Sequence, residues 1–318
     1  MKITELLAQA PGPLISYEII PPKRGSSAEQ ILAVVEDLMD FEPPFIDVTS
    51  HSAEAQYEEM PDGTWRRHLK RKRPGTIGLC AAIKGRYGIE TVPHLLCHGF
   101  TQGETEDALI ELSYLGIDNL MALHGDDTGF QKTVQPGVGV NTSAIELVRQ
   151  IDAMNRGKYS ADLIDADPSD FCIGVAGYPE KHYKAPNMTR DIVSLKQKME
   201  AGAHYITTQM FFDNQHYFRF VDRCRDAGID APIIPGIKIL TSRRQLELIP
   251  CRFHIEIPEE LASEIDAAKP EHTVDIGVEW ALKQCTDLLS AGAPCIHFYI
   301  MQRSTVVRRV AGPLRQMA

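Results

Sequence analysis

Short runs of apolar residues alternate along the chain with longer stretches in which apolar residues recur every three or four positions. The short runs have the length of β-strands, and the longer stretches, such as Ile31, Val34, Val35 and Leu38, have helical spacing. The pattern predicts strands at residues 14–20, 45–48, 76–82, 119–123, 171–176, 204–209, 232–239 and 295–300, with a further short element at 91–97.

The ends of the predicted helices support a repeated strand–helix unit. Four helical runs close with Gly, a small or β-branched residue and one further residue before a strand, at Gly116, Gly202, Gly228 and Gly292. A glycine after a helix adopts the left-handed conformation that satisfies the last carbonyl groups, so each copy predicts a tight helix-to-strand turn. Capping boxes are predicted at Ser27-x-x-Gln30 and Thr101-x-x-Glu104.

About eight such units are expected, which is the number in a closed parallel barrel. The predicted fold class is α/β, a (β/α)8 TIM barrel. The chain of 318 residues is expected to form this barrel as a single catalytic domain, residues 1–318.

The composition of the chain limits which binding partners and which cellular compartment are expected. The apolar runs are too short to cross a membrane, and residues 1–10 lack the basic start and long apolar core of a signal peptide, so a cytoplasmic protein is expected. Seven scattered cysteines without a C-x-x-C motif are interpreted as small buried thiols. A formal net charge of −10 argues against nucleic acid or an anionic membrane as a partner.

Residues 66–73, RRHLKRKR, are a local exception to the acidic balance. They are interpreted as a solvated helical face. The alternative is an anion-attracting patch for a polyanionic substrate tail.

The predicted strand at 119–123 is followed at once by the polar cluster His124-Gly125-Asp126-Asp127. In a parallel α/β protein, the loops after the carboxyl ends of the strands face a common crevice, so Asp126 is a candidate site residue. The alternative is that Asp126 or Asp127 caps the next helix or turn.

Other predicted strands also end in polar residues. These residues are Glu18, Thr49, His94, Tyr178, Glu180, His182, Gln209, Lys238, Tyr299 and Arg303. Individually, Gln209 could cap a helix, Tyr299 could be a core aromatic and Lys238 a rim charge. As a set, they converge on the mouth of the barrel, which predicts a functional site there.

A metal site receives less support. His94 and His98 have the i, i+4 spacing of zinc ligands on a helix, but Pro93 and Gly99 disfavour a helix at this place. No metal is predicted. A metal-dependent barrel hydrolase that uses His94, His98, Asp126 and His182 remains an alternative.

Seven segments resemble the flavin-dependent methylenetetrahydrofolate reductases, in the right order and over almost the whole chain. The segments are 17–23 (YEIIPPK), 92–97 (VPHLLC), 124–126 (HGD), 176–182 (AGYPEKH), 208–213 (TQMFFD), 234–237 (IPGI) and 297–299 (HFY). The resemblance implies an FAD-containing barrel that passes a hydride from NADH or NADPH to 5,10-methylenetetrahydrofolate. It also implies an oxidoreductase acting on CH–NH donors that forms 5-methyltetrahydrofolate for methionine synthesis.

The resemblance also implies roles for individual residues. Glu18 matches the general acid, Asp126 and Gln209 match residues that hold the pterin, and Asp126 also tunes the flavin. Tyr299 and Arg303 match residues that contact the aminobenzoyl portion of the folate. The positions matching flavin-binding residues are Thr49, His94, His124, Gly125, Asp126, Ala144, Tyr178, His182, Asp191 and Lys198.

The chain departs from the family pattern at a few positions. His124 stands where many members have Arg, and Arg243 stands where some have an aromatic residue that stacks on the nicotinamide. Ser194 and Gln197 stand where some have Asn and Arg. The chain resembles the short form without the regulatory domain of longer relatives, so no inhibition by adenosylmethionine is expected. A homo-oligomer is expected, and a flavin- or folate-binding barrel without catalysis is a second alternative.

Elementary chemistry agrees with the implied role of Glu18. The imidazolidine ring of the substrate opens to an N5-iminium cation only when the departing N10 amine receives a proton. Burial in a mostly apolar barrel raises the pKa of a carboxyl group, so Glu18 can be an acid near pH 7. Asp126 can stabilise the cation, and Gln209 offers a donor and an acceptor to the pterin amide edge.

Overall fold

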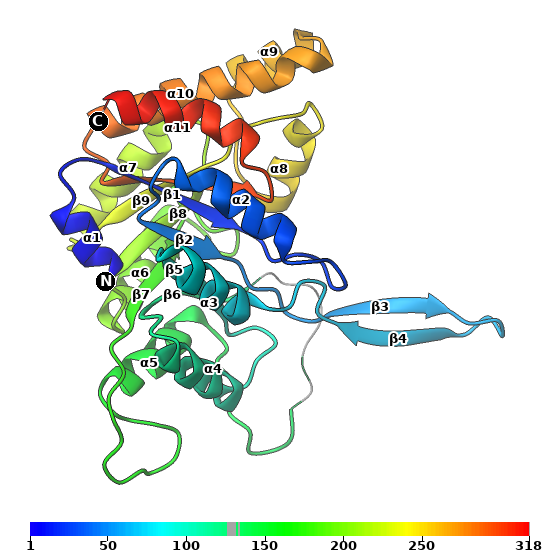
Figure 1. The fold of residues 1–318 in the computed structure, drawn as a ribbon, viewed down its shortest axis with the longest axis vertical. Helices are drawn as coiled ribbons and strands as arrows, with labels where there is room; N and C mark the ends of the chain where they lie inside the picture. The colour runs from blue at the N-terminus through cyan, green and yellow to red at the C-terminus, as the bar shows by residue number, and fades with distance from the viewer. Residues whose placement is uncertain (126–131, 133, 318) are drawn as a thin grey trace.

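Eight parallel strands close into a barrel in the computed structural model, which describes residues 1–125, 132 and 134–317 (Figure 1). Around the barrel the order is β1, β10, β9, β8, β7, β6, β5 and β2, which pairs with β1 again. The strands are β1 (Leu14–Ile19), β2 (Phe45–Val48), β5 (Glu90–Leu96), β6 (Asn119–Leu123), β7 (Cys172–Gly177), β8 (Tyr205–Met210), β9 (Ile233–Ile237) and β10 (Cys295–Met301). The predicted α/β barrel is confirmed.

Helices surround the barrel and alternate with its strands along the chain (Figure 1). They are α1 (Ile3–Gln9), α2 (Glu29–Met39), α3 (Thr76–Tyr87), α4 (Gln102–Tyr114), α5 (Ala144–Asn155), α6 (Met188–Glu200), α7 (Asn214–Asp226), α8 (Gln245–Phe253), α9 (Glu259–Ala267), η1 (Pro270–His272), α10 (Thr273–Ser290) and α11 (Thr305–Met317). The inner faces of α2 to α7, α10 and α11 and the outer face of the sheet form the largest hydrophobic core.

The prediction of a strand at residues 76–82 is wrong, because this segment begins helix α3. Its buried residues Thr76, Leu79, Cys80 and Ile83 have the i, i+3, i+4, i+7 spacing of a helix face. Gly75, with φ 102°, turns the chain into the helix. The third strand of the barrel along the chain is instead β5, which covers residues 91–96 of the short element predicted at 91–97.

The interpretation of residues 66–73 as a helical face is also wrong. Residues of this segment lie on β4 (Trp65–Lys70), which pairs antiparallel with β3 (Glu54–Glu59) in a hairpin that projects from the barrel (Figure 1). The turn contains Pro61-Asp62-Gly63, where Gly63 has φ 78° and the Met60 N–H donates to the Thr64 carbonyl at 2.7 Å. The Pro-Asp-Gly sequence is typical of a hairpin turn, but the run of basic residues after it was interpreted as a helix instead.

The helix ends follow the sequence signals in most places. Gly116, Gly202, Gly228 and Gly292 all have positive φ, as the helix-to-strand turns require. At α4, Thr101 accepts from the Glu104 N–H, and the Glu104 carboxylate accepts from the Thr101 N–H. The capping box expected at Ser27 and Gln30 is not formed, because α2 begins one residue later, with Ala28 at the cap position.

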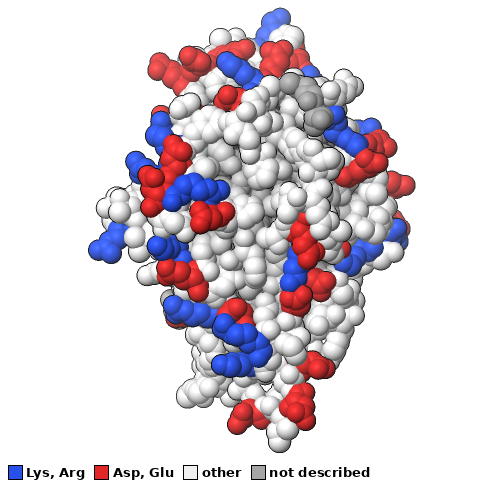
Figure 2. Space-filling model, turned by 90° about the vertical axis from the view of Figure 1, so that its left-hand side faces the viewer, with Lys and Arg blue, Asp and Glu red and all other residues white. Residues whose placement is uncertain are grey.

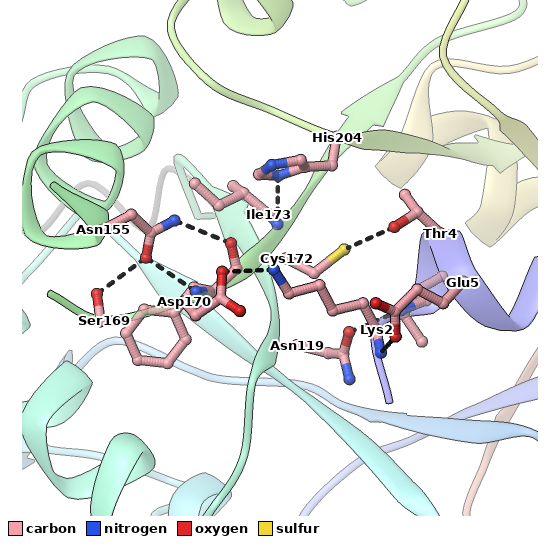
Figure 3. Close-up of polar contacts among 12 residues, drawn as sticks. Lys2, Thr4, Glu5, Asn119, Asn155, Ser169, Asp170, Cys172, Ile173 and His204 are labelled. Carbon is pink, nitrogen blue, oxygen red and sulfur yellow. Dashed lines mark hydrogen bonds and ion pairs between the residues drawn. The ribbon is translucent and has the colours of Figure 1, made fainter.

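The N-terminal segment closes the bottom of the barrel. Ile3 is fully buried in an apolar layer with residues from seven strands, including Phe45, Met121 and Tyr205. The side chain of Asn119 accepts from the Ile3 N–H and donates to the Met1 carbonyl. Figure 3 shows the neighbouring contacts of Lys2 and Thr4 with residues at the start of β7. The ionisable side chains of the candidate active site lie at the opposite end of the barrel, where the strands have their carboxyl ends.

Charged side chains of both signs are interspersed on the face seen in Figure 2, where they surround a largely uncharged central area. None of the described helices is both long enough and apolar enough to span a membrane.

Candidate active site

The carboxyl end of β1 carries Glu18 into a group of ionisable side chains. In the barrel, Glu18 lies beside Asp47 of β2 and Tyr299 of β10 in the strand register. Its Oε2 is 3.6 Å from Nε2 of His94, which lies on β5. The Glu18 side chain is 13% exposed, so this carboxyl group can still be reached from the mouth of the barrel.

Burial raises the pKa of Glu18 to about 7. The charge of His94 opposes this rise, Asp47 adds to it, and Lys238 opposes it. A carboxyl group with this pKa exchanges its proton near neutral pH, which is what a general acid requires.

His94 lies between two carboxyl groups. Its Nε2 is 3.3 Å from Oδ2 of Asp47, which is almost completely buried. Burial lowers the pKa of His94, but the hydrogen bond to Asp47 and the charges of Glu18 and Asp47 outweigh it, so the pKa is raised. Asp47 Oδ1 is buried without a hydrogen-bond partner among the described residues. Sequence reasoning missed Asp47, although one acidic residue in the apolar strand FIDV was a signal.

Lys238 and Tyr299 complete this side of the mouth. The Lys238 ammonium donates to the Tyr299 carbonyl at 2.7 Å, and burial lowers its pKa to about 8, while the charge of Glu18 opposes this fall. The Tyr299 hydroxyl donates to the Thr208 carbonyl at 2.6 Å. Gly236 makes room for the tyrosine, because a Cβ there would lie 2.5 Å from the Tyr299 ring.

The remaining predicted substrate residues lie farther along the strand ends. Gln209, at the end of β8, is partly buried and accepts from the Met210 N–H through Oε1. Arg303 follows β10 and is exposed. Asp126 lies outside the described residues.

A second group of predicted residues gathers after β7 and on α6. The Asp191 carboxylate accepts from the His182 N–H at 2.8 Å, and the His182 ring packs edge-on against Tyr178. Lys198 is partly buried, donates to the Ala176 carbonyl at 3.1 Å, and lies 6.0 Å from the centre of the Tyr178 ring.

The pKa of His182 falls to about 4, first because of burial and then because of the charge of Lys198 and other nearby cations. The imidazole is therefore neutral at pH 7. Burial also lowers the pKa of Lys198, which the charge of Asp191 opposes.

The other predicted cofactor residues come from two strand ends and a helix N-terminus. Thr49 follows β2, and its Oγ1 is buried without a hydrogen-bond partner in the described part of the chain. His124 follows β6 and stacks on His98, with ring centres 5.7 Å apart. Gly125 has φ 92°, and Ala144 is the first residue of α5.

A different set of side chains has metal-ligand geometry. Within residues 1–125, 132 and 134–317, the potential ligand atoms of Glu180, His216 and Glu256 lie within 4.8 Å of one another. Burial raises the pKa of Glu180 to about 7, and its Oε2 accepts from the Glu256 N–H. This group shares no histidine with the set considered for a hydrolase, and His94 lies on a strand rather than a helix.

The chain forms a closed (β/α)8 barrel, and acidic and basic side chains with shifted pKa values lie at the carboxyl ends of its strands. These two features place it in the class of barrel enzymes. Within that class, the chain belongs to the methylenetetrahydrofolate reductase family, because the model of that family matches residues 2–314. Members of this family are oxidoreductases.

Relatives with the same name cover nearly the whole chain. The 5,10-methylenetetrahydrofolate reductase of Pectobacterium carotovorum subsp. carotovorum is 28% identical over 95% of this chain and 90% of its own length. The 5,10-methylenetetrahydrofolate reductase of Escherichia coli (strain K12) is also 28% identical, over 95% of this chain and 91% of its own length. Methylenetetrahydrofolate reductase 2 of Saccharomyces cerevisiae is 30% identical over 95% of this chain but only 47% of its own.

A solved structure shares the fold at low sequence identity. It is an uncharacterised protein from Clostridium thermocellum that binds two copies of 5-methyl-5,6,7,8-tetrahydrofolic acid. The TM-score is 0.63 with 14% identity, and the match covers 99% of each chain. Together, the comparisons do not favour the metal-dependent hydrolase.

Proposed function

We propose that the protein is an FAD-dependent enzyme that reduces 5,10-methylenetetrahydrofolate to 5-methyltetrahydrofolate with NADH or NADPH, and so supplies the methyl group for methionine synthesis. The observation that carries the proposal is the buried Glu18, whose pKa is about 7, at the mouth of the barrel. Relatives named for NADPH in Caenorhabditis elegans and for NADH in Oryza sativa subsp. japonica support a nicotinamide nucleotide as the donor.

Glu18 protonates the N10 amine as the imidazolidine ring opens. The carboxylate that remains lies near His94 and Lys238, whose positive charges stabilise it. Asp47 holds His94 in position through its hydrogen bond. The folate then stands in the mouth, with Asp126 and Gln209 at the pterin and with Tyr299 and Arg303 at the aminobenzoyl group.

The residues on the other side of the mouth suit a flavin. The buried Thr49 Oγ1 needs a polar partner, neutral His182 offers an uncharged polar ring, and the Lys198 cation favours an anionic group. When bound, FAD would carry the hydride between the nucleotide and the folate. We assign its binding to Thr49, His94, His124, Gly125, Asp126, Ala144, Tyr178, His182, Asp191 and Lys198.

We further propose that residues 1–318 act as one catalytic domain in the cytoplasm. The chain carries seven free thiols, six of them buried, which suits a reducing compartment.

An absorption spectrum followed by anaerobic titration tests the proposed function. The purified protein should be yellow, release FAD on boiling, bleach with NADH or NADPH, and regain its colour when methylenetetrahydrofolate is added. Colourless protein, FMN in the supernatant or no response to the folate would contradict the proposal. A folate-binding barrel without catalysis would also fail to oxidise NADH with a quinone acceptor.

A further inference from the structure

Three segments that follow neighbouring strands of the barrel bring a histidine and two glutamates together. β7, β8 and β9 are adjacent in the barrel. Glu180 follows β7, His216 lies in the first turn of α7, which follows β8, and Glu256 lies between α8 and α9, after β9. In the part of the chain that the structure describes, the potential ligand atoms of these residues lie within 4.8 Å of one another. We call the three residues the Glu–His–Glu group.

Glu180 is the fixed member of the group and has one oxygen left over. Its Oε2 accepts from the Glu256 N–H at 2.6 Å, which holds the carboxyl group against the segment that carries Glu256. Its Oε1 is buried and has no hydrogen-bond partner among the described residues. A buried carboxylate oxygen without a donor is costly, so this atom needs a proton or a cation.

The charges around Glu180 favour a cation. Burial raises the pKa of Glu180 to about 7, the Glu256 N–H opposes this rise, and the carboxylates of Glu256 and Asp213 add to it. Both of these neighbouring charges are negative. Like charges that are held together in a partly buried place repel one another, and a divalent cation bound between them relieves the repulsion.

We propose that Glu180, His216 and Glu256 form a binding site for one Zn²⁺ ion, which ties the segments after β7, β8 and β9 to one another. An imidazole together with carboxylates suits Zn²⁺, whereas Mg²⁺ and Ca²⁺ prefer ligand sets made of oxygen alone. Ligand atoms about 2.1 Å from a tetrahedral zinc ion lie about 3.4 Å apart, so the group must close slightly around the ion. Glu256 is exposed and can make this movement.

One existing hydrogen bond competes with the ion. Arg219, which lies one turn after His216 on α7, donates to Nδ1 of His216 at 3.2 Å. While Nδ1 accepts this bond, the proton of the neutral ring is on Nε2, so neither ring nitrogen is free to bind zinc. Arg219 is exposed, and a hydrogen bond from an exposed, flexible side chain contributes little stability. Zn²⁺ can therefore displace Arg219.

Isothermal titration calorimetry with zinc chloride tests the site, after EDTA treatment and dialysis of the purified protein. The wild type should bind one Zn²⁺ per chain, and Glu180→Gln and His216→Ala should each weaken this binding by about tenfold or more. The matched control His272→Ala removes an exposed histidine that lies beside Asp275 elsewhere on the surface, and it should bind Zn²⁺ like the wild type. Circular dichroism checks that each variant is folded.

Arg219→Met distinguishes this site from nonspecific binding of zinc to surface carboxylates. The substitution frees a ring nitrogen of His216 and removes a nearby cation, so the variant should bind Zn²⁺ more tightly than the wild type. Binding to the folded state should also raise the unfolding temperature of the wild type in excess Zn²⁺, but not that of His216→Ala.

A wild-type protein that binds no Zn²⁺ would overturn the proposal. So would a Glu180→Gln or His216→Ala variant that binds Zn²⁺ as tightly as the wild type, or an Arg219→Met variant that binds it less tightly. These outcomes are independent of flavin and folate, because zinc binding and unfolding are measured without either.

Discussion

At the scale of single residues, Glu18 is governed by competing electrostatic effects. Burial and Asp47 favour its neutral form, while His94 and Lys238 favour the carboxylate. Because burial outweighs the two cations and leaves the pKa of Glu18 at about 7, the group can both hold and release a proton near neutral pH. Two variants examine this balance.

Glu18→Gln should separate two activities of the enzyme. Glutamine has a similar size but cannot protonate the leaving N10 amine, and general-acid catalysis contributes about 10²–10⁴-fold. NADH-dependent reduction of methylenetetrahydrofolate should therefore fall by about that factor. Oxidation of NADH by a quinone, which needs no proton on N10, should stay near the wild-type rate. Equal loss of both activities would show that Glu18 only supports the barrel mouth.

Lys238→Met should move the alkaline limb of the pH–rate profile for folate reduction. As the proposed general acid, Glu18 acts only while it is protonated, so the rate should fall as pH rises through its pKa of about 7. Removing a cation that lowers this pKa moves the fall to higher pH. Lys158→Met, at an exposed site, is the control and should leave the profile in place. A shift to lower pH would mean that Lys238 does not act on Glu18 through its charge.

At the scale of elements, two similar cap sequences have different outcomes. Thr101 and Glu104 satisfy each other's N–H groups at the start of α4. At α2 the cap position falls on Ala28, which has helical backbone angles, and Ser27 only accepts from the exposed Glu29 N–H. The same sequence pattern therefore forms a capping box at α4 but not at α2.

Thr101→Ala should lower the free energy of unfolding by about 1 kcal/mol, because an N–H group at the start of α4 loses its acceptor. Ser27→Ala should cost only a few tenths of a kcal/mol, since its bond is exposed and lies outside a capping box. Urea denaturation of both variants gives the comparison. Equal losses would contradict the difference between the two caps.

At the scale of the whole molecule, the chain terminus is part of the core. Residue 3 is usually in a frayed segment, yet Ile3 is fully buried at the bottom of the barrel. Asn119 fixes it from β6, and Met1 pairs with Glu90 of β5 through its amino group. The floor of the barrel thus joins the first residues to strands in the middle of the chain.

Ile3→Ala should reduce the free energy of unfolding by about 2–4 kcal/mol, as expected for a cavity in a packed layer. Ile164→Ala, at a side chain that is 93% exposed, should change it by less than about 0.5 kcal/mol. Thermal or urea unfolding of the two variants measures the difference. A loss at Ile3 no larger than that at Ile164 would mean that the floor is not closed by this segment.

The sequence by itself determined the repeated unit and the end of the barrel that holds the site. Strand length, helical spacing and the glycines after the helices are local properties, and strand polarity alone sends Glu18, Thr49 and Tyr299 to the same mouth. Family motifs then gave the residues their expected roles. Local pattern could not separate the apolar helix at Thr76 from a strand, because a short apolar run satisfies both periods.

Only the tertiary structure decided which side chains meet. Glu18, Asp47 and His94 lie on three strands and Lys238 directly follows a fourth, and barrel closure brings them together. Burial and the neighbouring charges that set the pKa of Glu18 are properties of that arrangement, so no sequence spacing contains them. The two faces of the β3–β4 hairpin likewise depend on the pairing of β3 with β4, because register determines which residues share a face.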